Sequence, residues 1–419
     1  MREFFDELET RDAQTRDAQT LAAIAAQVGH AAKNAPAYAE ILAGADPRAL
    51  TSFDALAELP LTRKSEVARL QRAAPPFGGL SARRPGELQY LFASPGPIYE
   101  PAAARADYWR FARALFAAGF RAGDVAQCCF SYHLTPAGAM GDSGCRALGC
   151  AVIPAGTGQS EQQAQTMADL QADGYIGTPS FLRIILEKAD ETGADVSALR
   201  KALLSGEALP PALRGEFAER GIGALQCYAT ADLGLIAYES RADDGLIIDE
   251  GVHVEIVSPD GAPLPDFETG EVVVTTLNPD YPLIRFATGD LSAFMPGQSE
   301  CGRTNRRLRG WLGRADQTAK VRGMFIHPSQ ITQALQRHPE IARARLVIDW
   351  HEQRDRMTLH CEPKPGARAG DALAAAVAAT IREICKVRGE VQWAKRGALA
   401  DDGKVIDDIR DYRNEQTGK

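Results

Sequence analysis

The spacing of hydrophobic positions changes along the chain, and each change predicts a different kind of structure. Residues 1–70 have helical spacing, and a further helix is predicted near residues 108–116, where apolar side chains recur on one face. Between residues 123 and 240, short apolar runs alternate with helical stretches. The strands predicted there are 125–130, 151–153, 175–176, 202–204 and 225–228. Such alternation is typical of a mainly parallel sheet with helices on both faces.

After about residue 245 the apolar runs become β-branched and are separated by turn residues. The runs 252–257 and 271–276, with Pro259-Asp-Gly261 between them, predict antiparallel hairpins. A smaller α+β unit is predicted from about residue 317, with a helix near 371–386 and another over Val405–Tyr412.

We therefore expect an α/β fold with two domains. Residues 1–315 would form a large N-terminal domain, with mainly parallel sheets flanked by helices plus an antiparallel β subdomain. Residues 316–419 would form a small α+β C-terminal domain. Because no low-complexity linker separates the two, the junction is expected to be a short hinge. A length of 419 residues agrees with this division, since one ordinary core seldom grows so large.

Composition excludes several classes of protein. Lys and Arg number 47 against 55 Asp and Glu, and the resulting net charge of −8 argues against a nucleic-acid binder. The eight cysteines lie mostly in apolar runs and form no CxxC pair, so the sequence indicates neither a zinc knuckle nor a redox pair. No run of about 18 apolar residues predicts a membrane span, and the first residues lack the apolar core of a signal peptide. We expect a protein of the reducing cytoplasm, without nucleic-acid or membrane partners.

Four polar or Gly-rich loops directly follow predicted strands. In a parallel sheet, ligands bind at the carboxyl ends of the strands, so these loops are the first candidates for a site. Each loop alone is also typical of a turn or a helix cap. The four loops are Gly177–Ser180, Ser205–Glu207, Tyr228–Asp232 and Thr288–Asp290.

The order and spacing of these loops resemble the adenylate-forming superfamily, which includes acyl-CoA synthetases, firefly luciferase and the adenylation domains of peptide synthetases. Within it, the chain is most similar to phenylacetate–CoA ligases, and the similarity runs nearly end to end. It is carried by Ala35–Tyr38, Leu59–Lys64, Val152–Gly158, Gly177–Ser180, Arg285–Leu291, Cys301–Thr304, Gly313–Asp316 and Arg322–Gln330.

The resemblance implies an ATP-dependent acid–CoA ligase that forms an acyl-adenylate and then a thioester, with ATP, Mg²⁺ and coenzyme A as cofactors. The acid would be a small organic acid, aromatic or otherwise. A homodimer would be in keeping with this family, although no sequence feature requires one.

The same resemblance implies a nucleotide site in the large domain. Its residues would be Ser205, Gly206 and Glu207 along the adenine; Tyr228 stacked on that ring, followed by Ala229 and Thr230; Asp232 holding Mg²⁺ through ATP; and Asp290 on the ribose hydroxyls. Asp232 stands where the family usually has Glu, and a shorter carboxylate still ligates magnesium. The alternative for Tyr228 is a core tyrosine at a strand end.

Three further residues take roles from the resemblance. Arg314 would contact the nucleotide, and Asp316 would be the hinge about which the small domain turns. Lys404, in Asp401-Asp-Gly-Lys404, would enter the active site and stabilise the charge that develops as the carboxylate attacks the α-phosphate. Without the resemblance, Lys404 reads as an exposed turn lysine.

The phosphate-binding loop departs from the family pattern. That loop is rich in Ser, Thr and Gly and ends in Gly-Lys, whereas the corresponding stretch here is Phe92–Pro101. Ser94 and Gly96 remain as predicted phosphate-binding residues, but the threonines and the lysine are absent. Pro95 and Pro97 lack the backbone N–H groups that cradle phosphate. Two alternatives therefore stay open: a homologue that binds AMP or acyl-CoA without ATP chemistry, and an adenylating enzyme with an acceptor other than CoA.

Two other regions differ from the family. Some relatives hold zinc with Cys and His, but the matching positions here are Ser240, Ile247, Ser299 and Cys301, so we expect no structural zinc.

The stretch after residue 129 corresponds to the acyl pocket. It contains Phe130, Tyr132, His133, Thr135 and Pro136 as the predicted acid-pocket residues. Thr135 and Pro136 replace the family's Phe-Thr, which favours a hydroxylated or smaller acid. His133 would bond the substrate carboxylate, or else be a buried, satisfied histidine.

Overall fold

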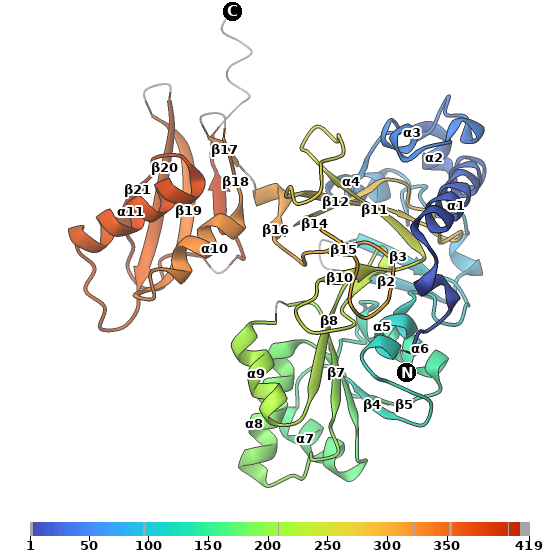
Figure 1. Ribbon diagram of the computed structural model, residues 1–419, viewed down its shortest axis with the longest axis horizontal. Helices are drawn as coiled ribbons and strands as arrows, with labels where there is room; N and C mark the ends of the chain where they lie inside the picture. Colours follow the sequence, from blue (N-terminus) through green and yellow to red (C-terminus); the bar gives the residue numbers. More distant parts are fainter. Residues whose placement is uncertain are drawn as a thin grey trace, which may run out of the picture. The chain divides into compact units, whose positions relative to one another are not determined.

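A computed structural model describes residues 3–94, 98–207, 209–317, 319–321, 324–351, 354–400 and 402–410 (Figure 1). The contacts within the chain divide it into two compact units. The large unit comprises residues 1–288 and 292–311, and the small unit comprises residues 289–291 and 312–419. The expected domain boundary after residue 315 stays a proposal. No helix among the described residues is both long and apolar enough to cross a membrane.

A nine-stranded sheet forms the centre of the large unit. Five of its strands run parallel in the order β8-β7-β6-β4-β5, as the alternating pattern predicted. They are β4 (Val125–Cys128), β5 (Ala151–Pro154), β6 (Gly174–Gly177), β7 (Lys201–Leu204) and β8 (Gly223–Thr230). The sheet continues beyond β8 through antiparallel pairs to β9 (Gly234–Tyr238), β10 (Leu246–Ile248), β15 (Arg307–Leu308) and β14 (Phe294–Met295).

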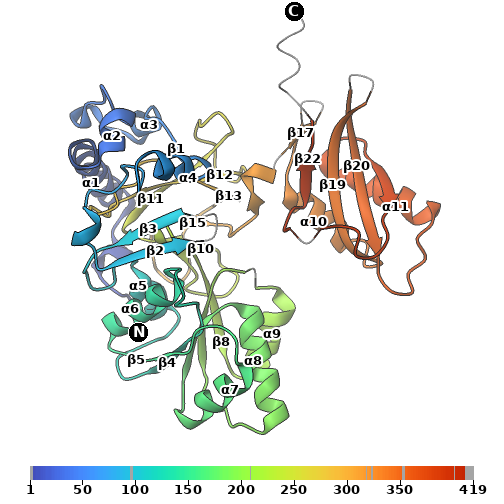
Figure 2. The same ribbon diagram turned by 180° about the vertical axis from the view of Figure 1, so that it is seen from behind.

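Helices cover both faces of the parallel strands, and successive strand residues enter opposite cores. Tyr175 packs into the core that holds α7 (Ser160–Asp169), α8 (Pro179–Thr192) and α9 (Pro211–Glu219), whereas Ile176 enters the core with α5 (Phe111–Ala117) and α6 (Ala137–Leu148). Figure 2 shows α7, α8 and α9 together along these strands. Burial on both sides of the central strands β6 and β7 explains why these two are almost entirely apolar.

A second sheet lies under the N-terminal helices. Its order is β1 (Thr62–Arg63), β13 (Phe286–Ser292), β12 (Gly270–Thr276) and β11 (Val252–Val257), with β16 (Gly313–Arg314) paired to β13. β11 and β12 form the predicted antiparallel hairpin. Apolar side chains of α1 (Ala13–Asn34), α2 (Pro36–Ile41), α3 (Phe53–Ala57) and α4 (Lys64–Ala73) share one core with this sheet. A separate hairpin joins β2 (Tyr90–Ser94) to β3 (Ile98–Ala102). Single-turn 3₁₀ helices are Glu7–Thr10, Pro47–Ala49, Pro85–Glu87 and Ala315–Gln317.

The small unit is α+β, with its own apolar core. Its four-stranded sheet has the order β21 (Glu390–Trp393), β20 (Arg354–Pro363), β19 (Ile341–His351) and β22 (Ile406–Asp408), with helices α10 (Pro328–Gln336) and α11 (Asp371–Cys385) and a β17 (Ala319–Val321)–β18 (Met324–Ile326) pair.

The helix predicted over Val405–Tyr412 is wrong in its described part. Ile406–Asp408 is the strand β22, which pairs in parallel with Leu346–Ile348 of β19. The apolar residues 405, 406 and 409 have a spacing compatible with a helix, but the exposed edge of β19 offers unpaired backbone groups, and pairing with it overrides the local pattern.

A buried arginine ties the second sheet to the N-terminal helices. Arg285, just before β13, is 2 % exposed. Its guanidinium bonds both carboxylate oxygens of Glu255 on β11, at 3.1 and 3.0 Å. It also donates to the carbonyl oxygens of Ala57, Leu59 and Gly261. Five donated bonds from one planar group therefore join residue 285 to two other regions of the chain, residues 57–59 and 255–261.

We expect Arg285→Met to lower the free energy of unfolding by about 3–5 kcal/mol, because Glu255 would remain as an uncompensated buried charge. Urea unfolding followed by circular dichroism measures the change. The control is Arg84→Ala, which breaks an exposed pair with Glu87 and should cost less than about 1 kcal/mol. Equal effects of the two substitutions would contradict this role of Arg285.

Candidate active site

The ends of three parallel strands bring the predicted adenine loops together. Ser205, directly after β7, donates its backbone N–H to the carbonyl of Gly177 at the end of β6. Its Oγ donates to the carbonyl of Cys227 in β8, at 2.8 Å. Gly206 has φ +82°, a conformation that favours glycine. Glu207 is exposed and accepts a bond from the backbone N–H of Ser180, at 3.3 Å. The loops predicted from the sequence are therefore neighbours at one edge of the sheet.

Tyr228 lies near the end of β8 and is half-buried. Its hydroxyl bonds Thr288 Oγ1 at 3.3 Å, and Thr288 in turn donates to the carbonyl of Val272. These bonds link the end of the nine-stranded sheet to β13 of the second sheet. Ala229 and Thr230 follow and are also half-buried, and Thr230 Oγ1 accepts from the backbone N–H of Leu233. The stacking role of Tyr228 stays a prediction.

Asp232, in the turn between β8 and β9, forms a buried ion pair with a residue far away in the sequence. Lys64 Nζ lies 2.7 Å from Asp232 Oδ2, where the Asp232 side chain is fully buried and that of Lys64 is 28 % exposed. Asp232 Oδ1 is buried and has no hydrogen-bond partner among the described residues. The predicted Mg²⁺ ligand therefore has one oxygen engaged by an ammonium group and one available.

A second carboxyl group lies within electrostatic reach of this pair. Glu100, on β3, is 2 % exposed and accepts a bond from Ser94 Oγ at 3.0 Å. Burial, reinforced by the negative charge of Asp232, raises the pKa of Glu100 to about 8. The hairpin of the predicted phosphate loop thus presents a buried carboxyl group and Ser94. Gly96 lies outside the described residues.

The predicted acid-pocket loop follows β4 and is attached to this hairpin. Ala93 on β2 donates its backbone N–H to the carbonyl of Leu134, at 2.8 Å. Tyr132 and His133 are exposed, Phe130 and Thr135 are half-buried, and Pro136 is buried. The alternative of a buried, satisfied His133 is therefore wrong. The local reason is the Ser131–Thr135 turn, in which the backbone N–H of His133 bonds Ser131 Oγ and leaves the imidazole outside.

In the small unit, Asp290 and Arg314 face each other across paired strands. Asp290 on β13 is paired with Arg314 on the antiparallel strand β16. Arg314 Nη1 lies 3.2 Å from Asp290 Oδ1. The intervening Gly289 has φ +77°, and a Cβ there would come within 2.7 Å of the Arg314 guanidinium. Glycine therefore allows the guanidinium to lie over the strand. The nucleotide roles of Asp290 and Arg314 stay predictions.

The loop that carries Lys404 is attached to residues beside the predicted hinge. Gln317, one residue after Asp316, donates to the carbonyl of Gly403 and accepts from the backbone N–H of Val405. Lys404 is exposed, and its Nζ lies 3.0 Å from Asp407. One glutamine side chain thus holds both neighbours of Lys404.

Of the four positions that match the zinc site of some relatives, only Cys301 carries a side chain typical of a zinc ligand. Ser299 bonds Asp244, and Cys301 accepts from the backbone N–H of Arg303. No group of three or more His, Cys, Asp or Glu side chains suited to a metal occurs in the described part of the chain. The expectation of no structural zinc stays a prediction.

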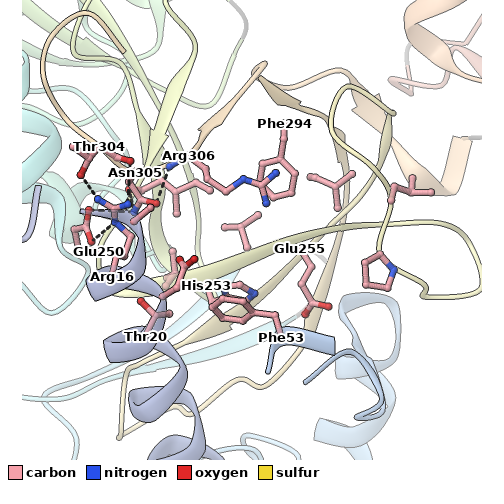
Figure 3. A pocket seen from close by; sticks show the side chains of 18 of the residues that line it. Arg16, Thr20, Phe53, Glu250, His253, Glu255, Phe294, Thr304, Asn305 and Arg306 are labelled. Carbon is pink, nitrogen blue, oxygen red and sulfur yellow. Dashed lines mark hydrogen bonds and ion pairs between the residues drawn. The ribbon is translucent and has the colours of Figure 1, made fainter. Parts of the chain in front are cut away.

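A cavity of about 340 Å³ lies elsewhere in the large unit, lined by α1, α3, β11 and residues 304–306 (Figure 3). None of the predicted nucleotide residues lines it. Its buried charges form ion pairs within the protein: Glu250 with Arg11 and Arg16, and Glu255 with Arg285. His253 stacks on Phe53 at 4.4 Å, and burial lowers its pKa to about 4. These contacts give the cavity a structural character, and the strand ends remain the candidate site.

Lys64 and Glu100 were not among the residues predicted for the site. Lys64 stood in the Leu59–Lys64 stretch that carried the family resemblance, and Glu100 stood in the altered loop. The presence of a charged residue in each of these two segments was the only hint in the sequence. The fold is what brings both residues near Asp232.

We expect stability to fall as pH rises through the titration of Glu100. Its folded pKa, about 8, lies above the ordinary value of 4.5, so the folded protein binds the proton more tightly than the unfolded chain. The stabilisation is fully present below about pH 4.5 and is lost as pH approaches 8. Comparison of urea midpoints at about pH 5.5 and about pH 8.5 should show a smaller decrease for Glu100→Gln than for wild type. Glu40→Gln, on the exposed face of α2, should leave the wild-type decrease unchanged, and an equally steep decrease in Glu100→Gln would refute the assignment.

Comparison with known proteins identifies the family of the chain. A family model described as "AMP-binding enzyme" matches residues 143–278. The phenylacetate–coenzyme A ligase of Aromatoleum evansii is 30 % identical over 82 % of this chain and 80 % of its own. That of Escherichia coli K12 is 33 % identical over 73 % and 72 %. An open conformation of 2-hydroxyisobutyryl-CoA ligase, solved with its acyl-adenylate and CoA, has a TM-score of 0.83 and 25 % identity, covering 96 % of this chain and 93 % of that one. The chain belongs to the phenylacetate–coenzyme A ligase family of AMP-binding enzymes.

Proposed function

We propose that this protein is an ATP-dependent acid–CoA ligase that makes an acyl-adenylate and then an acyl-CoA thioester. The observation that carries the proposal is the adjacency of the Ser205 and Tyr228 loops at the ends of β7 and β8, in a chain related along most of its length to acid–CoA ligases. The first step joins the substrate carboxylate to the α-phosphate and releases pyrophosphate. The second joins the acyl group to the CoA sulfur and releases AMP.

Each group of residues has a part in this reaction. Ser205, Gly206 and Glu207 would line the adenine edge, and Tyr228 would cover the ring. Asp290 would accept bonds from the ribose hydroxyls, since a carboxylate offers acceptor oxygens only. Arg314, bonded to Asp290, would orient that carboxylate and contact the nucleotide. Lys404 would stabilise the charge at the α-phosphate during the first step. For the second step, rotation about Asp316 would move Lys404 away and admit the thiol.

The residues around Asp232 fit a magnesium ion. Its Oδ1 is buried and has no partner in the described chain, and an oxygen ligand of this kind suits a hard cation. Asp232 would hold the ion, with nucleotide phosphates as further ligands. When bound, Mg²⁺ would neutralise charge on the phosphates.

The acid is proposed to be a small organic acid, for example a hydroxy acid or a small aryl acid. The predicted acyl loop offers the half-buried Thr135 and the exposed His133. The hydroxyl of Thr135 would bond a substrate hydroxyl, and the imidazole of His133 would bond the carboxylate. The structurally similar 2-hydroxyisobutyryl-CoA ligase was solved with 2-hydroxyisobutyryl-AMP and CoA, which supports the inclusion of hydroxy acids. A cytoplasmic location and a homodimer stay predictions.

One observation favours a second candidate function, a nucleotide or acyl-CoA binding protein without ATP turnover. The β2–β3 hairpin presents the buried Glu100 and contains no Lys or Arg among Tyr90–Ser94 and Ile98–Ala102. When ionised, the Glu100 carboxylate would repel the negative charge of a triphosphate. Calorimetry distinguishes the two functions, since tight AMP binding without measurable MgATP binding would favour this candidate. Adenylation with a non-CoA acceptor would instead give pyrophosphate release that is independent of CoA.

We expect Lys404→Ala to lower the rate of pyrophosphate release over a panel of aromatic, aliphatic and hydroxy acids by about 100-fold or more, because a positioned charge on the developing oxyanion is lost. Thioester formation from a preformed acyl-adenylate should change much less. The control is Lys395→Ala, an exposed lysine of the same unit, which should retain the wild-type rate. Absence of ATP-dependent turnover with every acid in wild type would refute the ligase.

A further inference from the structure

The ammonium group of Lys64 pairs with a buried carboxylate, while the Lys64 side chain as a whole stays partly exposed. Its Nζ lies 2.7 Å from Asp232 Oδ2. The Asp232 side chain is fully buried, whereas the Lys64 side chain is 28 % exposed. An ammonium group has three donors. Asp232 takes one of them and orients the others, so Lys64 has the means to bind an anion from the accessible side.

The two elements that carry this pair end at the predicted nucleotide site. Thr62 and Arg63 form β1, which runs parallel to Phe286 and Ala287 of β13, so Lys64 leaves the sheet beside Thr288. Thr288 bonds the Tyr228 hydroxyl. Asp232 follows β8 by two residues. Lys64 therefore lies at the same end of the strands as Tyr228, where the nucleotide is proposed to bind.

A lysine at this place would complement the negative charge of a triphosphate. A nucleoside triphosphate carries several negative charges, and proteins that transfer its groups place Lys, Arg or a metal ion against them. The described parts of the β2–β3 hairpin supply a hydroxyl, Ser94, and a buried carboxyl, Glu100, but no cation. Residues 95–97 are Pro, Gly and Pro. The cation in contact with the carboxylate of the site comes instead from β1 and α4.

We propose that Lys64 contacts the β- and γ-phosphates of ATP, with Asp232 as the residue that positions its ammonium group. This inference rests on the proposed function, and it assigns to Asp232 a role besides magnesium binding. It also explains how a loop without lysine is compatible with ATP chemistry. The competing explanation is a purely structural ion pair, in which case removal of Lys64 affects folding and every ligand alike.

The experiment measures ATP and AMP affinities by isothermal titration calorimetry, first with EDTA and then with Mg²⁺. For Lys64→Met we expect ATP affinity to fall by at least about tenfold, which corresponds to about 1.4 kcal/mol, under both conditions. AMP affinity should stay within about twofold, because AMP lacks the two phosphates concerned. Lys64→Arg should retain most of the ATP affinity. The matched control is Arg63→Met, which removes the neighbouring cation that pairs with Glu271 instead and should leave both affinities unchanged.

A second variant separates binding from stability. Lys64→Met leaves Asp232 as an unpaired buried charge, so its thermal unfolding must be compared with that of Lys64→Met/Asp232→Asn, in which no charge remains. The double variant should recover stability but not the affinity for ATP in EDTA. An unchanged ATP affinity in Lys64→Met, or equal losses of ATP and AMP affinity in the stable double variant, would overturn the role of Lys64. Failure of the wild type to bind any nucleotide would instead overturn the proposed function, and with it this inference.

Discussion

The arrangement of the large unit depends on the desolvated guanidinium of Arg285. Because Arg285 is almost completely buried, each of its donors must be satisfied by the protein. Its partners are Glu255 on β11 and carbonyl groups at residues 57, 59 and 261. The same residue accepts, through its carbonyl, the backbone N–H of Thr62 that begins β1. One side chain therefore fixes both β1 and β13, the strands that lead to Lys64 and to Asp290.

The Arg285–Glu255 pair thereby helps to position a second ion pair, that of Lys64 and Asp232, for which we propose a role in phosphate binding. β1 is only two residues long, too short to hold a lysine in place by itself. Its pairing with β13 and the anchoring of residues 57 and 59 give it a fixed direction. Lys64, the first residue of α4, is thereby placed where it pairs with Asp232 in the turn between β8 and β9. A buried pair of this kind costs desolvation energy, and the partial exposure of Lys64 is the feature that distinguishes it from the closed pair of Arg285 and Glu255.

The surroundings of Glu100 bear on how the altered phosphate loop could accept a triphosphate. A proline-rich hairpin with a buried Glu100 would oppose a triphosphate if that carboxyl group were ionised. Burial and the charge of Asp232 raise its pKa to about 8, which keeps the proton on Glu100 over much of the neutral range. The hairpin is also bonded to the acid loop through Ala93 and Leu134. The predicted phosphate loop and the predicted acid-pocket loop are thus joined directly to each other.

The sequence by itself determined the class of fold, the family, and which loops follow the parallel strands. Those features follow from apolar periodicity and from short motifs, which are local properties of the chain. The strand Ile406–Asp408, in contrast, was decided by the open edge of β19, and the exposure of His133 was decided by a tight turn at Ser131. The grouping of Lys64, Glu100 and Asp232 also required the tertiary structure. Their separation in sequence is large, and only the strand order and the burial of their charges make them neighbours, because electrostatic interactions depend on distance in space and on exclusion of water.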